Sequence, residues 1–436
     1  MDGGGGLLSP DPAAAFATGS LGLVTPASWS LIAFIVAVAL SCTSRINVGL
    51  IALALSWVLG SWVAGLKPEA VAAGFPAMLF VTLVGVTLLF ALAEQNGALE
   101  ALARRFLGAL RDPRFVPPLI FLFGAVLSGI GPGAVAATAL MAPLAMAIGL
   151  RAGAPAFLVA LMIANGANAG NLSSLSAVGI IARDGMAKAG LPHHEGKVFF
   201  ANFAAHLIVG AVAWLWLRRG HRASGLDGPA PSFEKLNPSQ ILTLLVLALW
   251  ILGTLVLSLP VGFAAFVAAS VLILAGAADE RVALKSVPWA VIVMVTGMTT
   301  LVSVLEKTGG MALVTALLAA LATPATVNGM VAFVTGVIST WSSTSGVVMP
   351  AFLPTSSALA AQVGGGDPFA IALSINVGSS LVDVSPLSTI GALCVAAVGD
   401  PEAARGLFRK LMIWGLSMTL VGAVLCQLAA GPLARM

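Results

Sequence analysis

The chain has 436 residues, of which 59% are hydrophobic and only 9% are charged. A soluble domain carries about 25% charged residues, so this chain has too few to cover a water-exposed surface of its size. From 241 to 278 there is no Asp, Glu, Lys or Arg, which is enough chain for roughly two bilayer crossings. The composition excludes a soluble protein and predicts an all-α polytopic protein embedded in a lipid bilayer.

Other residue counts exclude further classes of protein. No basic cluster indicates a nucleic-acid partner, although the formal net charge is +4. The three cysteines lie far apart in apolar runs, which gives neither a metal-binding spacing nor a disulfide framework. No cofactor or phosphate-loop motif occurs, and His206 is the only histidine inside an apolar stretch. We therefore expect neither an enzyme nor a cofactor, apart from Na⁺ as a coupling ion.

In chain order, the N-terminal segment comes first. Residues 1–25 begin with a Gly run and lack a basic start, so we expect a disordered external tail and no signal peptide. Two long apolar stretches, 155–189 and 368–398, are interrupted by Gly, Asn and Ser, which predicts broken helices. Uninterrupted runs of spanning length lie at 26–44, 48–65, 76–94, 197–217, 238–258, 260–277, 288–305 and 404–428.

Two further stretches, 116–150 and 327–362, each pair two short apolar legs around a polar tip. The tips run from Ser128 to Gly133 and from Trp341 to Gly346. A leg such as 119–128 would reach about 15 Å, which is half of a hydrocarbon core of about 30 Å. The pattern predicts two re-entrant hairpins.

An internal repeat divides the chain into two halves. A shift of 212 positions aligns 76–179 with 288–391 without a gap. Registered pairs include Pro76 and Pro288, Glu94 and Glu306, Gly166 and Gly378, and Ser173 and Ser385. Each half then holds five transmembrane helices, one of them broken, and one re-entrant hairpin, and the odd number of crossings turns the second half upside down. We predict two inverted repeats, at 26–217 and 238–436, joined by a linker at 218–237.

The basic residues orient this topology. With ten crossings, 15 of the 21 Lys and Arg residues fall on one face of the membrane and 6 on the other. The positive-inside bias makes the richer face cytoplasmic. The linker is then cytoplasmic, and both termini of this multi-pass protein of the cytoplasmic membrane are external.

The interrupted stretches are the candidate site. They run from Ala164 to Ser174 and from Asn376 to Pro386. An unwound helix at membrane depth offers N–H donors that suit oxyanions and carbonyls that suit cations. Asp383 is the only acidic residue deep in a predicted membrane segment, so it should be paired, protonated or bound to a cation. Two alternatives stay open, namely that the breaks are packing kinks and that Asp383 only caps the second half-helix.

At these residues the chain resembles a known family. The segments that carry the resemblance are Asn165-Gly166-Ala167-Asn168-Ala169-Gly170, Ser342-Ser343-Thr344-Ser345-Gly346-Val347-Val348-Met349-Pro350 and Asp383-Val384-Ser385-Pro386-Leu387-Ser388. Together with the order of helices, they resemble the divalent anion:sodium symporter group of the ion transporter superfamily, and are most like MatC-type dicarboxylate (malonate) carriers. The resemblance covers 26–430. It implies a homodimeric elevator transporter that holds a dicarboxylate between two cation sites.

The resemblance also implies site residues. The symporters' Ser-Asn-Thr signature is absent from both tips, and Ser385-Pro386 stands where the symporters have Thr-Pro. The predicted substrate-binding residues are Asn168, Asn171, Ser173, Ser342, Ser343, Thr344 and Ser385. The predicted cation-binding residues, with Na⁺ as the only metal, are Asp383, Ser128, Ser345 and Asn376.

The sequence therefore predicts a secondary active transporter for a small dicarboxylate, coupled to Na⁺ or H⁺. One alternative is an ion or proton antiporter of the same superfamily, in which Asp383 carries a proton and no organic anion binds. Another is the large membrane subunit of a binding-protein-dependent dicarboxylate transporter. A membrane hydrolase is the weakest alternative, because His206 is the only base available at membrane depth.

Overall fold

The structure is a computed structural model that describes residues 25–44, 46–108, 113–217, 235–398 and 400–436. All regular elements in these ranges are helices, and none is a strand. The first half holds α2 (Pro26–Thr43), α3 (Val48–Trp57), α4 (Pro68–Ala72), α5 (Ala77–Gln95), α6 (Ala98–Gly108), α7 (Val116–Gly129), α8 (Gly133–Arg151), α9 (Ala156–Gly170), α10 (Ala177–Lys188) and α11 (Glu195–Leu217). A π-helical segment, Val58–Val63, extends α3.

The second half repeats this order with shorter pieces after its hairpin tip. It holds α12 (Pro238–Val256), α13 (Val261–Leu274), α14 (Glu280–Ser286), α15 (Trp289–Thr308), α16 (Gly310–Ala319), α17 (Val327–Trp341), α18 (Met349–Phe352), α19 (Ser356–Gln362), α20 (Pro368–Leu381), α21 (Thr389–Ala396) and α22 (Pro401–Arg435). All of the predicted tail except Thr25 falls within residues 1–24, and most of the predicted linker falls within 218–234; both ranges lie outside the described residues.

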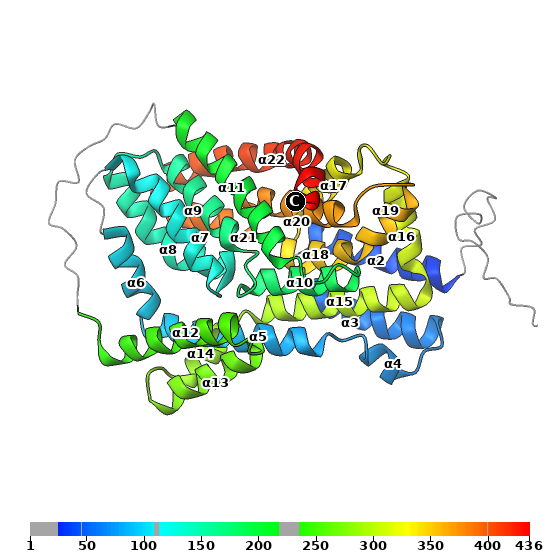
Figure 1. The fold of residues 1–436 in the computed structure, drawn as a ribbon, viewed down its shortest axis with the longest axis horizontal. Coiled ribbons are helices and arrows are strands. Elements are labelled where there is room, and N and C mark those ends of the chain that lie inside the picture. Colours follow the sequence, from blue (N-terminus) through cyan, green and yellow to red (C-terminus); the bar gives the residue numbers. More distant parts are fainter. Residues whose placement is uncertain (1–24, 45, 109–112, 218–234, 399) are drawn as a thin grey trace, which may run out of the picture.

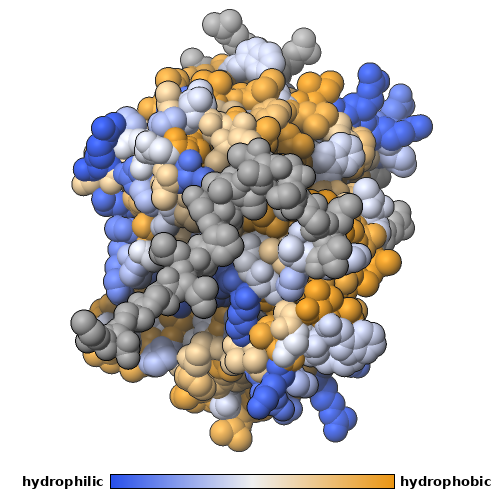
Figure 2. All heavy atoms as spheres, turned by 90° about the vertical axis from the view of Figure 1, so that its right-hand side faces the viewer, coloured by the Kyte–Doolittle hydropathy of each residue, from blue (hydrophilic) through white to orange (hydrophobic). Residues whose placement is uncertain are grey.

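Large apolar side chains cover much of the outer surface. Leu249 on α12 is 66% exposed, Leu274 at the end of α13 is 87% exposed and Ile413 on α22 is 70% exposed. Within the described ranges, eight helices are long and apolar enough to cross a membrane. Figure 2 shows apolar regions that reach the outline of one end of the molecule, with hydrophilic residues dispersed between them. Such a surface needs hydrocarbon around it, so this is a multi-pass membrane protein.

The helix boundaries recur at the spacing of the sequence repeat. Six pairs of helix starts lie 212 positions apart: Pro26 and Pro238, Pro68 and Glu280, Ala77 and Trp289, Ala98 and Gly310, Ala156 and Pro368, and Ala177 and Thr389. The register therefore extends beyond the aligned segment 76–179. The opposite membrane orientation of the two halves stays a prediction.

Helices from the two halves cross at very short backbone distances, and each of these crossings contains glycine. A Cβ on Gly49 of α3 would lie 2.2 Å from the carbonyl oxygen of Val293 on α15, and one on Gly297 would lie 2.2 Å from the carbonyl oxygen of Gly49. The reciprocal crossing joins α5 to α13, where a Cβ on Gly85 would lie 2.5 Å from the carbonyl oxygen of Gly262. Only glycine allows backbones to approach this closely.

The molecule has two layers in the view of Figure 1. The lower layer contains α3, α5 and α15 with α12, α13 and α14, and the upper layer contains the α7 to α9 group, α11, α20 and α22. The hairpin helices pack on the broken helices of their own half, α7 and α8 on α9, and α17 on α20. Segments from the two halves also cross over, since α21 packs on α8 and α10 packs on α18.

The two hairpins differ from the simple pairs of short legs that the sequence predicts. The second leg of the first hairpin, α8, has 19 residues, about 28 Å at 1.5 Å per residue, and is long enough to span a membrane. The second leg of the other hairpin is no single helix but a π-turn at Thr344–Val348, then α18, a 3₁₀ turn and α19. Pro350 and Pro354 explain this fragmentation, since neither can donate a backbone hydrogen bond. The return of each hairpin to its own side stays a prediction.

Candidate functional site

Both predicted broken helices are interrupted, but later than expected. The first half-helix, α9, continues to Gly170, and α10 begins at Ala177. The second, α20, continues to Leu381, a 3₁₀ turn covers Val382–Val384, and α21 begins at Thr389. The expected interruptions, Ala164 to Ser174 and Asn376 to Pro386, are therefore correct in their second parts and wrong in their first parts, which are helical.

Close packing explains this difference. A Cβ on Gly166 would lie 2.3 Å from the carbonyl oxygen of Phe121, and one on Gly170 would lie 2.0 Å from that of Ala125. Both carbonyls belong to α7, so these glycines allow α7 and α9 to cross closely and do not unwind α9. The unwound segments proper are 171–176 and 382–388.

A polar cavity of about 280 Å³ lies where the two breaks meet the second hairpin tip. Asn171 reaches it from the first break, Asp383 and Ser388 reach it from the second, and Ala134 reaches it from the start of α8. The tip contributes four consecutive hydroxyl-bearing residues, Ser342 to Ser345. Six of the eleven predicted site residues thus line one cavity: Asn171, Ser342, Ser343, Thr344, Asp383 and Ser345.

Asp383 is held by hydroxyl groups and by no basic side chain. The Thr344 hydroxyl donates to Asp383 Oδ1 at 2.8 Å and also lies 3.2 Å from the carbonyl oxygen of Ser379. Ser339 contacts the Thr344 hydroxyl, and the Ser388 hydroxyl donates to the Asp383 carbonyl oxygen. Among the described residues that line the cavity, Asp383 is the only charged one. Within the described ranges, which do not include Arg45, its carboxyl group has no ion-pair partner.

Asn171 stands at the position that corresponds to Asp383 in the repeat. Its Oδ1 accepts a hydrogen bond of 3.0 Å from the backbone N–H of Ala134, in the first turn of α8. The side chain is only 4% exposed. Asn171 therefore fastens the first break to the first hairpin, as Asp383 fastens the second break to the second hairpin through Thr344.

The serines at the second tip have different surroundings. The Ser342 hydroxyl lies 2.5 Å from the Ser41 hydroxyl of α2, which joins the tip to the first half. The Ser343 hydroxyl accepts a 2.9 Å bond from the N–H of Gly346 and caps the π-turn. Since each hydroxyl has further acceptor or donor capacity, both can still contact a polar ligand in the cavity.

The structure does not bring the other five predicted residues to the cavity lining. Ser173 and Ser385 accept bonds from backbone N–H groups two residues later, at Leu175 and Leu387. The remaining three, Ser128, Asn168 and Asn376, are fully buried. Ser128 Oγ and both polar atoms of the Asn168 side chain have no hydrogen-bond partner among the described residues.

A second buried polar cluster escaped sequence reasoning. Asn165 on α9, Asn202 and His206 on α11, and Ser380 on α20 are all completely buried and hydrogen-bonded to one another. Asn202 and His206 are four residues apart, which places them on one helix face. That spacing was a usable signal, but the partners lie 41 and 174 residues away from His206, so only the tertiary structure reveals the cluster.

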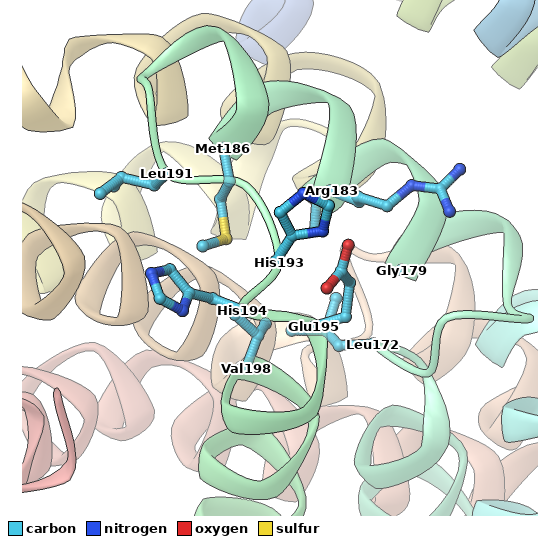
Figure 3. Close-up of a pocket in the computed structure, with 10 residues that line it drawn as sticks. Leu172, Gly179, Arg183, Met186, Leu191, His193, His194, Glu195 and Val198 are labelled. Atoms are coloured by element: carbon cyan, nitrogen blue, oxygen red, sulfur yellow. The ribbon is translucent and has the colours of Figure 1, made fainter. Parts of the chain in front are cut away.

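A separate small space lies beside the loop between α10 and α11. His193, His194 and Glu195 line it together with Arg183, and Figure 3 shows the His193 and Glu195 side chains pointing toward one another. Its volume of about 10 Å³ is close to that of one water molecule, which excludes an organic ligand. No group of three metal-ligating side chains occurs in the part of the chain that the structure describes.

The fold and the cavity define a multi-pass membrane protein with a polar cavity at interrupted helices. Residues 25–171 match the model of the family described as dicarboxylate carrier protein MatC N-terminus, about a third of the chain. No curated protein sequence matches the chain.

Two solved structures share the fold. The YdaH transporter of Alcanivorax borkumensis superimposes with a TM-score of 0.58 at 17% identity, over 92% of this chain and 98% of its own. MtrF of Neisseria gonorrhoeae, described as illuminating a class of antimetabolite efflux pumps, superimposes with a TM-score of 0.56 at 13% identity, over 95% and 97%. At these identities the likeness shows a common fold.

Proposed function

We propose that the protein is a secondary active transporter that moves a small dicarboxylate across the cytoplasmic membrane together with Na⁺ or H⁺. The observation that carries this proposal is the convergence of Asn171, Asp383 and the tip residues 342–345 on one cavity. Sites formed by interrupted helices in membrane transporters bind substrates in this way.

The chemistry of the cavity suits a small anion. Eight hydroxyl-bearing residues and the amide of Asn171 line it, and Ser343, Ser345 and the Asn171 amide can donate hydrogen bonds to carboxylate oxygens. Its volume of about 280 Å³ is near the lower end of the range for small-molecule sites, about 300–1,000 Å³. A dicarboxylate of three to six carbons is the size class that we propose.

A cation bound together with the anion suits the charge of the cavity. Among the described residues that line it, Asp383 is the only charged one, and Arg45, between the lining residues Ser44 and Ile46, lies outside the described ranges. Like charges 4 Å apart repel by about 4 kcal/mol at an effective dielectric constant of 20. A Na⁺ or a proton at Asp383 removes this repulsion, which couples the two fluxes.

The comparisons support the same function. The matching family model is described as a dicarboxylate carrier protein, and the titles of the two solved structures name a transporter and a class of efflux pumps. The resemblance to the symporter group adds two elements to the proposal, a homodimer and an elevator movement of the upper layer against the lower.

Uptake into proteoliposomes tests the proposal. Labelled malonate, succinate and citrate should each be offered under an inward Na⁺ gradient, an inward proton gradient or neither. We expect one of the dicarboxylates to accumulate under one gradient only, and Ser343→Ala to weaken its uptake about tenfold.

Ser374→Ala is the matched control for this experiment. Ser374 is a fully buried serine on α20 whose hydroxyl bonds back to the Ala370 carbonyl at 2.8 Å, away from the cavity. Its uptake should equal that of the unmodified protein. Exchange of Na⁺ for H⁺ without any carboxylate uptake would contradict the proposal and identify the antiporter instead.

A further inference from the structure

The buried cluster of Asn165, Asn202, His206 and Ser380 joins the two half-helices at the centre of the molecule. His206 Nδ1 lies 3.1 Å from Asn165 Oδ1 on α9, and His206 Nε2 lies 3.4 Å from Ser380 Oγ on α20. Ser380 Oγ in turn donates to Asn202 Oδ1 at 2.7 Å. All four residues are 0% exposed, so no solvent satisfies them.

Backbone carbonyls fix the orientation of both amides. Asn165 Nδ2 donates to the Leu161 carbonyl at 3.0 Å, and Asn202 Nδ2 donates to the Asn168 carbonyl at 2.7 Å. Reversing either amide would place an oxygen against a carbonyl oxygen. Each amide therefore presents its Oδ1, which can only accept, to the His206 and Ser380 pair.

Between the acceptors Asn165 Oδ1 and Asn202 Oδ1, the cluster has one hydrogen atom fewer than its hydrogen bonds require. Three contacts need a hydrogen each, from His206 to Asn165, between His206 and Ser380, and from Ser380 to Asn202. A neutral imidazole supplies one and the Ser380 hydroxyl supplies one. The Val377 carbonyl, 3.2 Å from Ser380 Oγ, competes for that same hydroxyl hydrogen. The contact between His206 and Ser380 is the longest of the three, as expected for the contact that has no hydrogen.

We propose that His206 is a proton-binding site and that its protonation completes this cluster. An added proton on Nε2 donates to a lone pair of Ser380 Oγ, while the Ser380 hydrogen stays on Asn202 Oδ1. A continuous chain of hydrogen bonds then runs from Asn165 through His206, Ser380 and Asn202 to the Asn168 carbonyl, and it links α9 to α20. No other arrangement of the four side chains fills all three contacts.

The helices packed against α11 supply no counter-charge that is hydrogen-bonded to His206. Among the elements packed against α11, the helices α7, α9 and α20 carry no titratable residue. The other two helices packed against α11 are α10 and α22. Besides His206, the titratable residues of these three helices are Arg183, Asp184 and Lys188 on α10, Glu402, Arg405, Arg409, Lys410, Cys426 and Arg435 on α22, and Glu195 and Lys197 on α11. None of them is hydrogen-bonded to His206. A buried imidazolium is costly without a negative charge nearby, so proton binding should depend on one that arrives.

The cavity provides that charge. Ser380 lies three residues before Asp383, about one helical turn, and Asn168 lies three residues before Asn171. Both ends of the cluster therefore adjoin the residues that line the cavity. A dianion in the cavity favours the proton on His206, and the proton in turn favours the dianion. This second step rests on the proposed transport of a dicarboxylate.

Nitrogen NMR of the full chain in lipid nanodiscs tests the proton site directly. With ¹⁵N-labelled histidine and glutamine at positions 193, 194 and 221, His206 gives the only imidazole signal. We expect a neutral imidazole with hydrogen on Nδ1 at high pH and an imidazolium at lower pH. A signal that stays neutral until the protein unfolds, or hydrogen on Nε2 alone, would overturn the proposal.

Ser380→Ala and Ser374→Ala form the matched pair of variants. Ser380→Ala removes the acceptor for the added proton, so proton binding to His206 should weaken about tenfold or more. Ser374 lies on the same helix and is equally buried, and its hydroxyl donates to the Ala370 carbonyl and makes no contact with His206, so Ser374→Ala should leave the titration unchanged. Equal titration in both variants would contradict the role given to Ser380.

Addition of malonate or succinate during the titration tests the link to the cavity. The dianion should move the titration of His206 to higher pH, and His206→Gln should reduce proton uptake on addition of the dianion, with any remaining uptake assigned to Asp383. A titration that neither dianion shifts would refute the link and leave the proton site in place. If His206 titrates and no dicarboxylate is transported in proteoliposomes, the proposed function fails and the proton site stands.

Discussion

The two interrupted helices occupy equivalent positions in the repeat but carry different chemistry. In the first, Asn171 is neutral and its oxygen is bonded to the backbone of α8. In the second, Asp383 is acidic and is held by the Thr344 hydroxyl. Pro132 stands where the second tip has Thr344, so the first tip has no hydroxyl to offer at that position. In the proposed function, the first break therefore has a mainly structural role, and the second supplies the acidic group and the hydroxyls of the coupled site.

Removal of the charge from the second break should have the largest effect. Asp383→Asn keeps an acceptor for Thr344 but cannot neutralise a cation, so gradient-driven accumulation should be lost while downhill exchange persists. Proteoliposome uptake with and without Na⁺ and proton gradients measures both. Full accumulation by this variant under both gradients would exclude a coupling role and leave Asp383 as a helix cap, for which Asn is nearly as good.

Addition of a charge to the first break sharpens the comparison. Asn171→Asp keeps an oxygen for the Ala134 N–H but places a second carboxylate beside the cavity. Repulsion of a dianion should raise the KM for uptake by more than about tenfold. An unchanged KM would show that the first break lies away from the bound anion.

The hydroxyl that holds Asp383 should matter next. Thr344→Val keeps the shape of the side chain and removes its hydrogen bond to the carboxylate. The apparent affinity for the coupling cation should change about tenfold, falling for Na⁺ because the carboxylate is no longer held in place, and rising for H⁺ because the ionised carboxylate loses a donor. Thr340→Val is the control, since the Thr340 hydroxyl bonds only to the Gly336 carbonyl of its own helix, at 3.0 Å. If the affinity changes equally in both variants, the effect is not specific to the contact between Thr344 and Asp383.

Truncation at the first break should have the smallest effect on transport. Asn171→Ala removes the cap on α8, so the free energy of unfolding should fall by about 1 kcal/mol. KM should rise by at most about tenfold, because one hydrogen bond from the Asn171 amide to the anion is lost. Thermal unfolding in detergent measures the first quantity and uptake measures the second. A loss of transport as large as that of Asp383→Asn would remove the distinction between the two breaks.

Much of this comparison could be predicted from the sequence. The 212-residue register alone pairs Asn171 with Asp383, and the polar tip at 342–345 precedes the second break in the chain and lies beside both breaks in the fold. Composition and run length were sufficient for the helices, because a hydrocarbon environment selects long apolar helices with few alternatives.

The remaining features depend on tertiary contacts. A glycine in a membrane helix is consistent both with an unwound turn and with a close helix crossing. The sequence around Gly166 favours an unwound turn, whereas in the structure Gly166 allows a close helix crossing. His206 has no partner nearby in sequence, and its bonds to Asn165 and Ser380 depend on three helices meeting. Sequence patterns report local geometry, and these two features are set by neighbours far along the chain.

The reciprocal glycine crossings have a consequence for biosynthesis. When a ribosome has completed the first 217 residues, α5 is already in the membrane, but Gly262, the backbone partner of Gly85, has not been translated. Likewise, the crossing of α3 with α15 cannot form until α15, which begins about 240 residues later in the chain, has been translated. The first half therefore has open crossing sites until α13 and α15 have been made. Two separately produced halves would meet the same requirement, since each supplies the helix that completes a crossing in the other.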